Sequence, residues 1–163
     1  MTQVEVKIGI PKEDREAEGA FMNGLLADLF LLYTKTRNFH WNVTGPHFWA
    51  LHKMFESQYE MLDDEIDDLA ERIRALGGFA RATLTDYQHL AHLREDRSTT
   101  LSAREMLTEL LDDHEAVIRE LREEAAVCQD KHHDLGTSDF LTGLMEQHEK
   151  TAWMLRATLE GVA

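Results

Sequence analysis

Imidazole and carboxylate side chains concentrate in one stretch of the sequence, from His40 to Glu71. Between these two residues lie His52, Glu56 and Asp67. Glu56 follows His52 by four residues and Glu71 follows Asp67 by four, so each pair shares one face of a helix. Imidazole with several carboxylates suits Fe(II), and suits Mn or Zn less well. The stretch predicts a metal site; the alternative is a core histidine, His52, beside a solvated acidic face.

Helix geometry limits how these residues can share an ion. His52 and Asp67 are fifteen residues apart, which is ~22 Å of rise along a helix and ~60° of rotation. One ion cannot contact both residues of the same chain. Either another helix completes each half, or an antiparallel copy of this helix from a second subunit brings its Asp67 and Glu71 beside His52. A twofold axis near the middle of the helix gives two equivalent sites.

A metal centre inside a single bundle is the competing arrangement. Ferritin-type centres use a Glu-x-x-His pair on each of two helices and one Glu on each of the others. No Glu in this sequence is followed three residues later by His, and the residues three before His114 and His148 are apolar. The sequence therefore favours the intersubunit arrangement, and we interpret His114 and His148 as core histidines.

Long amphipathic helices must position these residues, because no proline follows Pro46 and apolar residues recur every three or four positions. One helix is predicted from Pro46 to the glycines at 77 and 78, with this inward stripe: Phe48, His52, Phe55, Tyr59, Leu62, Ile66, Leu69, Ile73 and Leu76. A helix before it ends near residues 42–45. A third begins at the Ser102/Glu105 capping box and runs to Cys128, and a fourth runs from near Thr137 to Gly161.

The connections between these helices predict the fold class. Short links join the first helix to the second and the third to the fourth, so each pair forms an antiparallel hairpin. The middle link, residues 77–101, is long, and we expect a short helix at 87–95. The prediction is all-α: a ferritin-like four-helix bundle of residues 16–163 with a short extra helix in the crossover, after an N-terminal tail of residues 1–15.

Composition excludes several classes of protein. The 163 residues include 17 Lys and Arg against 31 Asp and Glu, so the net charge is −14 and disfavours a nucleic-acid partner. No apolar run approaches the roughly 20 residues that span a bilayer, so no membrane association is expected. The start of the chain lacks a signal-peptide pattern, and Cys128 is the only cysteine. A cytoplasmic location is therefore expected.

Two runs of residues resemble a known family. They are His40-Trp41-Asn42-Val43-x-Gly45-x-x-Phe48-x-x-Leu51-His52-x-x-Phe55-Glu56 and Asp67-x-x-Ala70-Glu71-Arg72-Ile73-x-x-Leu76-Gly77. Both are similar to the signature of the Dps-type miniferritins, and the similarity extends through His148-Glu149-Lys150-x-x-Trp153. The resemblance implies a hollow homododecamer that oxidises Fe(II), preferentially with hydrogen peroxide rather than oxygen, stores ferric mineral and protects against oxidative damage.

The resemblance also implies roles for single residues at ferroxidase sites that hold two iron ions each, with Zn as a substitute metal. His40 and His52 would supply one half of each site, and Asp67 and Glu71 of the partner subunit the other half. Glu56 stands where many family members have Asp, which keeps the charge and lengthens the reach by one methylene. Trp41 matches an aromatic residue beside the iron site and would be open to oxidation; the alternative for Trp41 is packing.

Two other functions were weighed. Some members of the family condense DNA through Lys-rich tails, so the alternative is a nucleoid protein that protects DNA in starvation. Residues 1–18 of this chain carry three basic and five acidic side chains, so we expect DNA binding to be absent or weak. The third possibility is an inert helical scaffold.

Several histidines and carboxylates outside the main stretch are harder to assign. His132, His133 and Asp134 precede the last helix, where the resemblance places an acidic threefold channel, so Asp134 or Asp139 would guide Fe(II) inward. The alternative is that they are loop residues and residues that interact with the helix dipole. His89 and His92 are three residues apart on the expected short helix and are interpreted as surface residues, with a surface metal site as the alternative. Cys128, at helical spacing, is interpreted as a small core residue.

Overall fold

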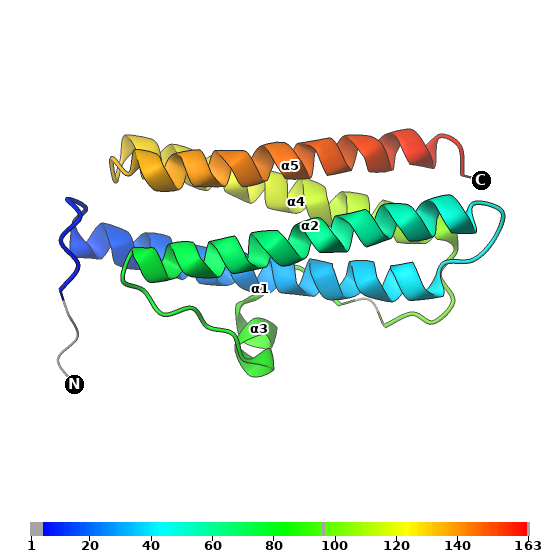
Figure 1. Cartoon of the computed structure of the whole chain (residues 1–163), viewed down its shortest axis with the longest axis horizontal. Coiled ribbons are helices and arrows are strands. Elements are labelled where there is room, and N and C mark those ends of the chain that lie inside the picture. Colours follow the sequence, from blue (N-terminus) through cyan, green and yellow to red (C-terminus); the bar gives the residue numbers. More distant parts are fainter. Residues whose placement is uncertain (1–4, 96, 163) are drawn as a thin grey trace.

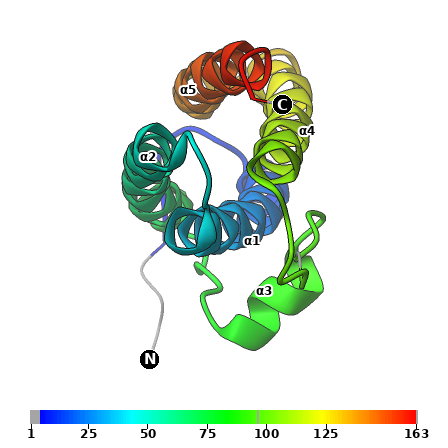
Figure 2. The same cartoon turned by 90° about the vertical axis from the view of Figure 1, so that its right-hand side faces the viewer.

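A computed structural model describes residues 5–95 and 97–162, and these residues form helices and no strands. The long helices are α1 (Lys12–Asn42), α2 (Phe48–Ala75), α4 (Ala103–Asp130) and α5 (Leu135–Leu159), and α3 (Leu84–Leu90) is short. The long helices run side by side, and the end-on view shows them around one centre with α3 outside (Figures 1 and 2). The predicted fold class is confirmed.

Pairing between the helices follows the two predicted hairpins. α1 packs along α2 and α4 packs along α5, while α3 and α4 also contact α1. α3 is attached through aromatic stacking, because the Tyr87 ring lies 4.4 Å from the Phe30 ring of α1, centroid to centroid. None of the helices formed by the described residues has an apolar stretch long enough to cross a membrane.

Local sequence explains where the helices begin. α4 starts at the predicted capping box, in which the Ser102 side chain accepts from the Glu105 backbone and the Glu105 side chain accepts from the Ser102 backbone. α2 begins at Phe48 rather than at Pro46. Gly45 has φ +102°, and Phe48 N–H donates to its carbonyl at 3.0 Å, so Pro46 lies in a turn that precedes the helix. A second capping box, at Thr83, starts α3 earlier than predicted.

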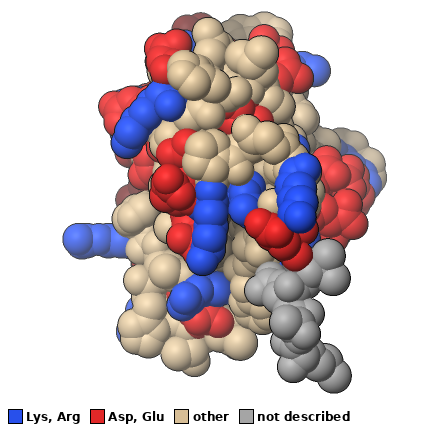
Figure 3. Space-filling model, turned by 90° about the vertical axis from the view of Figure 1, so that its left-hand side faces the viewer, with Lys and Arg blue, Asp and Glu red and all other residues tan. Residues whose placement is uncertain are grey.

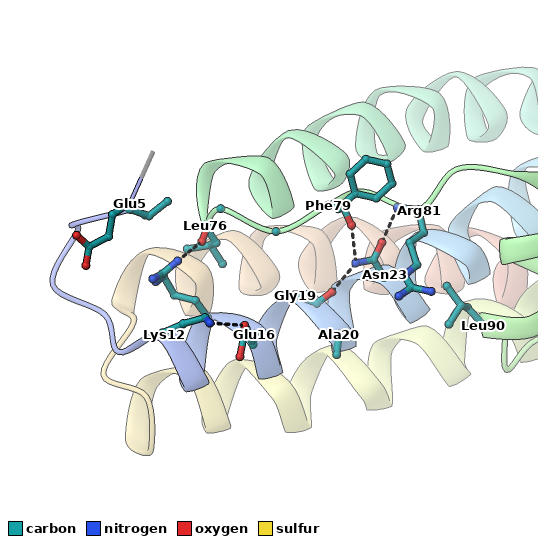
Figure 4. A pocket seen from close by; sticks show the side chains of 14 residues that line it. Glu5, Lys12, Glu16, Gly19, Ala20, Asn23, Leu76, Phe79, Arg81 and Leu90 are labelled. Atoms are coloured by element: carbon teal, nitrogen blue, oxygen red, sulfur yellow. Dashed lines mark hydrogen bonds and ion pairs between the residues drawn. The ribbon is translucent and has the colours of Figure 1, made fainter. Parts of the chain in front are cut away.

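Side chains of α1 hold the end of α2 and the start of the crossover through hydrogen bonds. α1 begins at Lys12, inside the predicted N-terminal tail. Arg15 Nη1 donates to the Leu76 carbonyl at the end of α2, at 2.8 Å. Asn23 of α1 donates to the Phe79 carbonyl at 3.1 Å and accepts from Arg81 N–H at 2.8 Å, beside the pocket shown in Figure 4. These bonds fix where the crossover leaves α2.

The buried face of α2 differs from the predicted stripe. It includes three residues outside that stripe: Leu51, Gln58 and Glu65. Four residues of the stripe are only partly buried or are exposed: Phe48, His52, Tyr59 and Ile66. The predicted stripe and the observed buried row both repeat every three or four residues, so periodicity alone does not distinguish them. Packing of α2 on α1 decides which of the two rows is buried. α2 is therefore rotated about its own axis relative to the prediction. His52 lies at the edge of the core rather than inside it.

Candidate metal centre

The hairpin between α1 and α2 brings two histidines into direct contact. His40 lies in the last turn of α1 and His52 in the second turn of α2. Their rings stack with centroids 3.8 Å apart and planes 19° from parallel. His40 Nδ1 lies 2.8 Å from the His52 carbonyl oxygen, and His52 Nδ1 lies 2.9 Å from the His40 carbonyl oxygen. The two residues therefore hold each other through a reciprocal pair of hydrogen bonds.

This pairing fixes the chemistry of both rings. A carbonyl oxygen can only accept, so Nδ1 of each neutral ring carries the proton and Nε2 keeps a lone pair. Among the described residues, none forms a hydrogen bond with Nε2 of His40 or of His52. A ring held by Nδ1–H on a backbone carbonyl, with Nε2 available, is the usual state of a metal-ligating histidine. The pair can therefore supply two imidazole nitrogens as ligands to a metal ion.

Glu56 lies one turn beyond His52 and is partly buried. Its carboxylate accepts a hydrogen bond from Lys53. That bond lowers the pKa of the Glu56 carboxyl, and the positive charge of Lys53 adds to the effect. The carboxylate is therefore ionised at neutral pH. A cation bound to Glu56 must compete with the ammonium group of Lys53.

Asp67 and Glu71 lie in the same continuous helix as His52 but far from the histidine pair. Both side chains are exposed, and neither has a hydrogen bond or ion pair with the described residues. α2 is one unbroken helix over this stretch, so the ~22 Å rise between His52 and Asp67 holds in the folded chain. One chain therefore presents two separate halves of the predicted ligand set.

Large aromatic side chains are exposed around the histidine pair. Trp41, the residue after His40, is 64% exposed, and Trp49 is 72% exposed. The Phe48 ring lies 5.2 Å from the His52 ring. Arg37 holds its guanidinium over the Trp41 ring at 5.2 Å. An apolar aromatic surface of this kind is characteristic of a face that another molecule covers.

The interior of the bundle contains a second polar group. His114 Nδ1 of α4 lies 2.8 Å from His148 Nδ1 of α5, and His148 Nε2 lies 3.2 Å from a carboxylate oxygen of Glu65 on α2. All three side chains are buried, which agrees with the interpretation of both histidines as core residues. Sequence reasoning missed Glu65, although its spacing of three from Leu62 and four from Leu69 could have indicated burial. A single carboxylate in a line with two imidazoles differs from a ferritin-type centre, which needs several carboxylates.

Burial of His114 makes stability depend on pH. Burial, assisted by His148, holds the pKa of His114 well below its usual value of 6.5. Below pH 6.5 the unfolded chain binds a proton that the folded chain refuses, so stability falls as the pH falls, by about 1.4 kcal/mol per pH unit and chain. In His114→Gln, which can still bond to His148 without titrating, we expect this part of the slope to vanish. Guanidinium midpoints from pH 7 to pH 5 measure the slopes; parallel slopes would refute the assignment.

The residues that the sequence suggested near the last helix and in the crossover differ in burial and in partners. Asp134 caps α5 by accepting from Thr137 N–H at 3.0 Å and pairs with Arg72 of α2 at 3.2 Å. Its carboxylate is therefore engaged within the chain, whereas Asp139 is exposed. His92 lies beyond the end of α3 and faces Asp28 of α1, with His92 Nδ1 and Asp28 Oδ2 3.2 Å apart.

The positions of three further histidines and of the cysteine complete the comparison with the sequence. His89 is exposed and contacts the Thr85 carbonyl within α3, and His133 is exposed with φ 55°. Cys128 is buried in the core, as expected. His132 is buried as well, at 5% exposure, which the sequence did not indicate because it lies in a polar loop.

Comparison with known proteins adds an independent line of argument. A family model described as a ferritin-like domain matches residues 20–163. An uncharacterised low-temperature-induced protein of Nostoc sp. is 44% identical, over 96% of this chain and 87% of that protein. DNA protection during starvation protein 2 of Bacillus anthracis is 38% identical, over 85% of this chain and 93% of that protein.

Solved structures give the same picture. A Dps protein from Vibrio cholerae O1, described as a member of a broad superfamily of ferritin-like diiron-carboxylate proteins, superposes with a TM-score of 0.90 at 29% identity. The match covers 98% of this chain and 99% of that one. A Dps protein from Bacillus brevis superposes with a TM-score of 0.86 at 35% identity, over 90% of this chain and 97% of that one.

Proposed function

Because the chain belongs to the Dps-type miniferritins, within the ferritin-like proteins, we propose that it is an iron-storing ferroxidase. Fe(II) is the substrate, and ferric mineral is the stored product. The observation that carries this proposal is the stacked His40–His52 pair, in which both Nδ1 protons are held by backbone carbonyls and both Nε2 atoms remain available. A purely structural histidine pair would have no need to leave Nε2 of both rings without a partner among the described residues.

Each site takes ligands from two subunits in this proposal. His40, His52 and Glu56 of one chain bind on one side, and Asp67 and Glu71 of the partner subunit close the other. Asp67 and Glu71, which are exposed and form no ion pair with the described residues, add two negative charges to that of Glu56. Hard oxygen ligands stabilise Fe(III) more than Fe(II), so they favour the oxidised product. Zn, which accepts the same imidazole and carboxylate ligands, would occupy the site without redox chemistry.

In this proposal hydrogen peroxide is preferred to oxygen as the oxidant, because two electrons reduce peroxide fully to water but reduce oxygen only to peroxide. Two Fe(II) ions give one electron each, and peroxide with two protons accepts both as its O–O bond breaks, which yields two waters. A single Fe(II) ion would give one electron and release a hydroxyl radical. Paired iron therefore protects against oxidative damage, and Trp41, exposed beside His40, is the nearest tryptophan in sequence that could reduce a stray oxidant.

The stoichiometry of the reaction tests this function. Under anaerobic conditions we expect two Fe(III) formed per peroxide and no spin-trapped hydroxyl radical. His52→Ala should lose the rapid phase, because it removes a ligand from every site, while His47→Ala, which removes an exposed histidine at the start of α2, should keep it. A ratio of one Fe(III) per peroxide, with radical at the level of free iron, would contradict the proposal.

The relatives named for DNA protection raise the question of DNA binding, which we continue to expect to be weak. The end of the bundle where α1 begins shows acidic and basic side chains interleaved (Figure 3). With a net charge of −14 per chain, few phosphate contacts could release counterions. A cytoplasmic location also remains part of the proposal, as does a homododecameric shell around the mineral.

A further inference from the structure

Three chemically reactive side chains meet at the end of the bundle opposite the histidine pair. Glu18 belongs to the early part of α1, Cys128 to the last turn of α4 and His132 to the loop that leads into α5. One donor atom of each lies within 4.8 Å of the others, and all three residues are buried. Glu18 and His40 are separated by ~33 Å of rise along α1, so this cluster is separate from the proposed iron site.

The contacts inside the cluster leave one buried oxygen without a partner. Glu18 Oε1 lies 3.0 Å from His132 Nδ1. Glu18 is fully buried, and its second oxygen, Oε2, accepts no hydrogen bond from the described residues. A buried carboxylate oxygen without a donor costs about 1–3 kcal/mol or more.

We propose that Glu18, Cys128 and His132 bind one divalent metal ion of the Zn²⁺ class. Thiolate, imidazole and carboxylate together form a mixed sulfur, nitrogen and oxygen donor set, which suits Zn²⁺ and not Mg²⁺ or Ca²⁺. The ion gives Glu18 Oε2 its missing partner. Two negative ligands balance the charge of the ion, and the neighbouring Asp134 carboxylate, which interacts with Glu18, is balanced by Arg72 at 3.2 Å.

The surroundings of His132 fit a ligand role. When Nδ1 binds the ion, Nε2 carries the proton, and Nε2 lies 3.8 Å from Asp14 Oδ1, one turn before Glu18 on α1. This distance is beyond hydrogen-bond range, but a small shift of the ring toward Asp14 would let the carboxylate orient the imidazole and raise its basicity. Zn²⁺ bond lengths put tetrahedral ligands about 3.4 Å apart, so the present cluster needs only a modest contraction. Such an ion would tie the start of α1 to the α4–α5 loop.

Cobalt provides a selective test, because Cys128 is the only cysteine of the chain and the iron site offers no sulfur. Metal-free, full-length protein is titrated with Co²⁺, both folded and during refolding, so that a closed site can load. We expect a thiolate-to-cobalt charge-transfer band at one ion per chain, which Zn²⁺ then abolishes because it binds such sites more tightly than Co²⁺. Zn²⁺ should also raise the unfolding temperature of the metal-free protein.

Variants separate this site from its neighbours. Cys128→Ser should lose the band, and Asp14→Asn, which removes only the partner of the imidazole, should weaken Co²⁺ binding roughly tenfold. His52→Ala and Glu124→Gln should keep the band, since Glu124 lies one turn before Cys128 but outside the cluster. Wild-type protein that shows no thiolate band under either loading condition overturns the proposal without reference to any variant. A band that survives unchanged in Glu18→Gln also overturns it. The iron chemistry is unaffected by either result.

Discussion

Protein refolded from an equal mixture of His52→Ala and Asp67→Ala chains is expected to recover about a quarter of the wild-type rate of peroxide-driven Fe(II) oxidation. Each variant alone should be inactive in the rapid phase, because each removes one half of every site. Recovery follows from the ~22 Å between the two residues on one rigid helix, which prevents one chain from supplying both halves to the same ion.

The fraction comes from random pairing. A site is intact only when its histidine half comes from an Asp67→Ala chain and its carboxylate half comes from a His52→Ala chain. Each choice has a chance of about one half, so about one site in four is complete across a twofold interface. Mixing the two assembled variants without unfolding should restore nothing, because the chains do not exchange.

Controls make the result decisive. Wild-type protein refolded in parallel measures the loss due to refolding. Asp68→Ala removes an exposed carboxylate next to Asp67 on a different side of α2 and should remain active alone. A site built inside one subunit allows no recovery, since every chain in the mixture still carries one broken half. Refolded mixtures as inactive as their parents, beside an active refolded wild type, would exclude the shared site.

The second prediction with a large expected effect concerns the mass of the assembled particle. In solution we expect a particle of about 225 kDa, which is twelve chains of 18.8 kDa each. The single chain exposes aromatic side chains that a monomer of this size has no reason to expose, among them Trp49 at 72%, Phe79 at 75% and Trp153 at 61%. Closed assembly covers such surfaces, and the shared site requires at least a twofold pair.

Light scattering coupled to gel filtration measures this mass, at moderate salt so that surface charge does not distort elution. Monomers would contradict both the assembly and the shared site, whereas a stable twofold dimer would preserve the site and remove the shell. A particle of twenty-four chains, about 450 kDa, would place the chain with the larger ferritins instead. Conditions that dissociate the particle should also stop rapid Fe(II) oxidation.

Much of the architecture was predictable from local rules. The Ser102/Glu105 capping box, the glycines that end α2 and the lengths of the links determined four long helices in two hairpins, and the structure confirms them. Helix rise alone established that His52 and Asp67 cannot serve one ion from the same chain. These features depend on residues close together in the sequence, where backbone geometry leaves few alternatives.

Tertiary packing decided the rest. Two rows of residues on α2 repeat every three or four positions, and only contact with α1 selected the one that contains Gln58 and Glu65. The reciprocal bonds between His40 and His52 require a particular crossing of two helices, which no single-helix pattern specifies.

The cluster of Glu18, Cys128 and His132 shows the same limit most clearly. Glu18 and His132 lie 114 residues apart in the sequence, yet their side chains are 3.0 Å apart. In the sequence Glu18 is one of several acids near the start of a helix, Cys128 is a small apolar residue and His132 belongs to a polar loop. The residue types and their spacing along the chain determine which side chains share one face of a helix, because helix geometry depends only on residues close together in the sequence. Which side chains meet in the interior depends on how helices that are far apart in the sequence pack together. Only the tertiary structure specifies that packing.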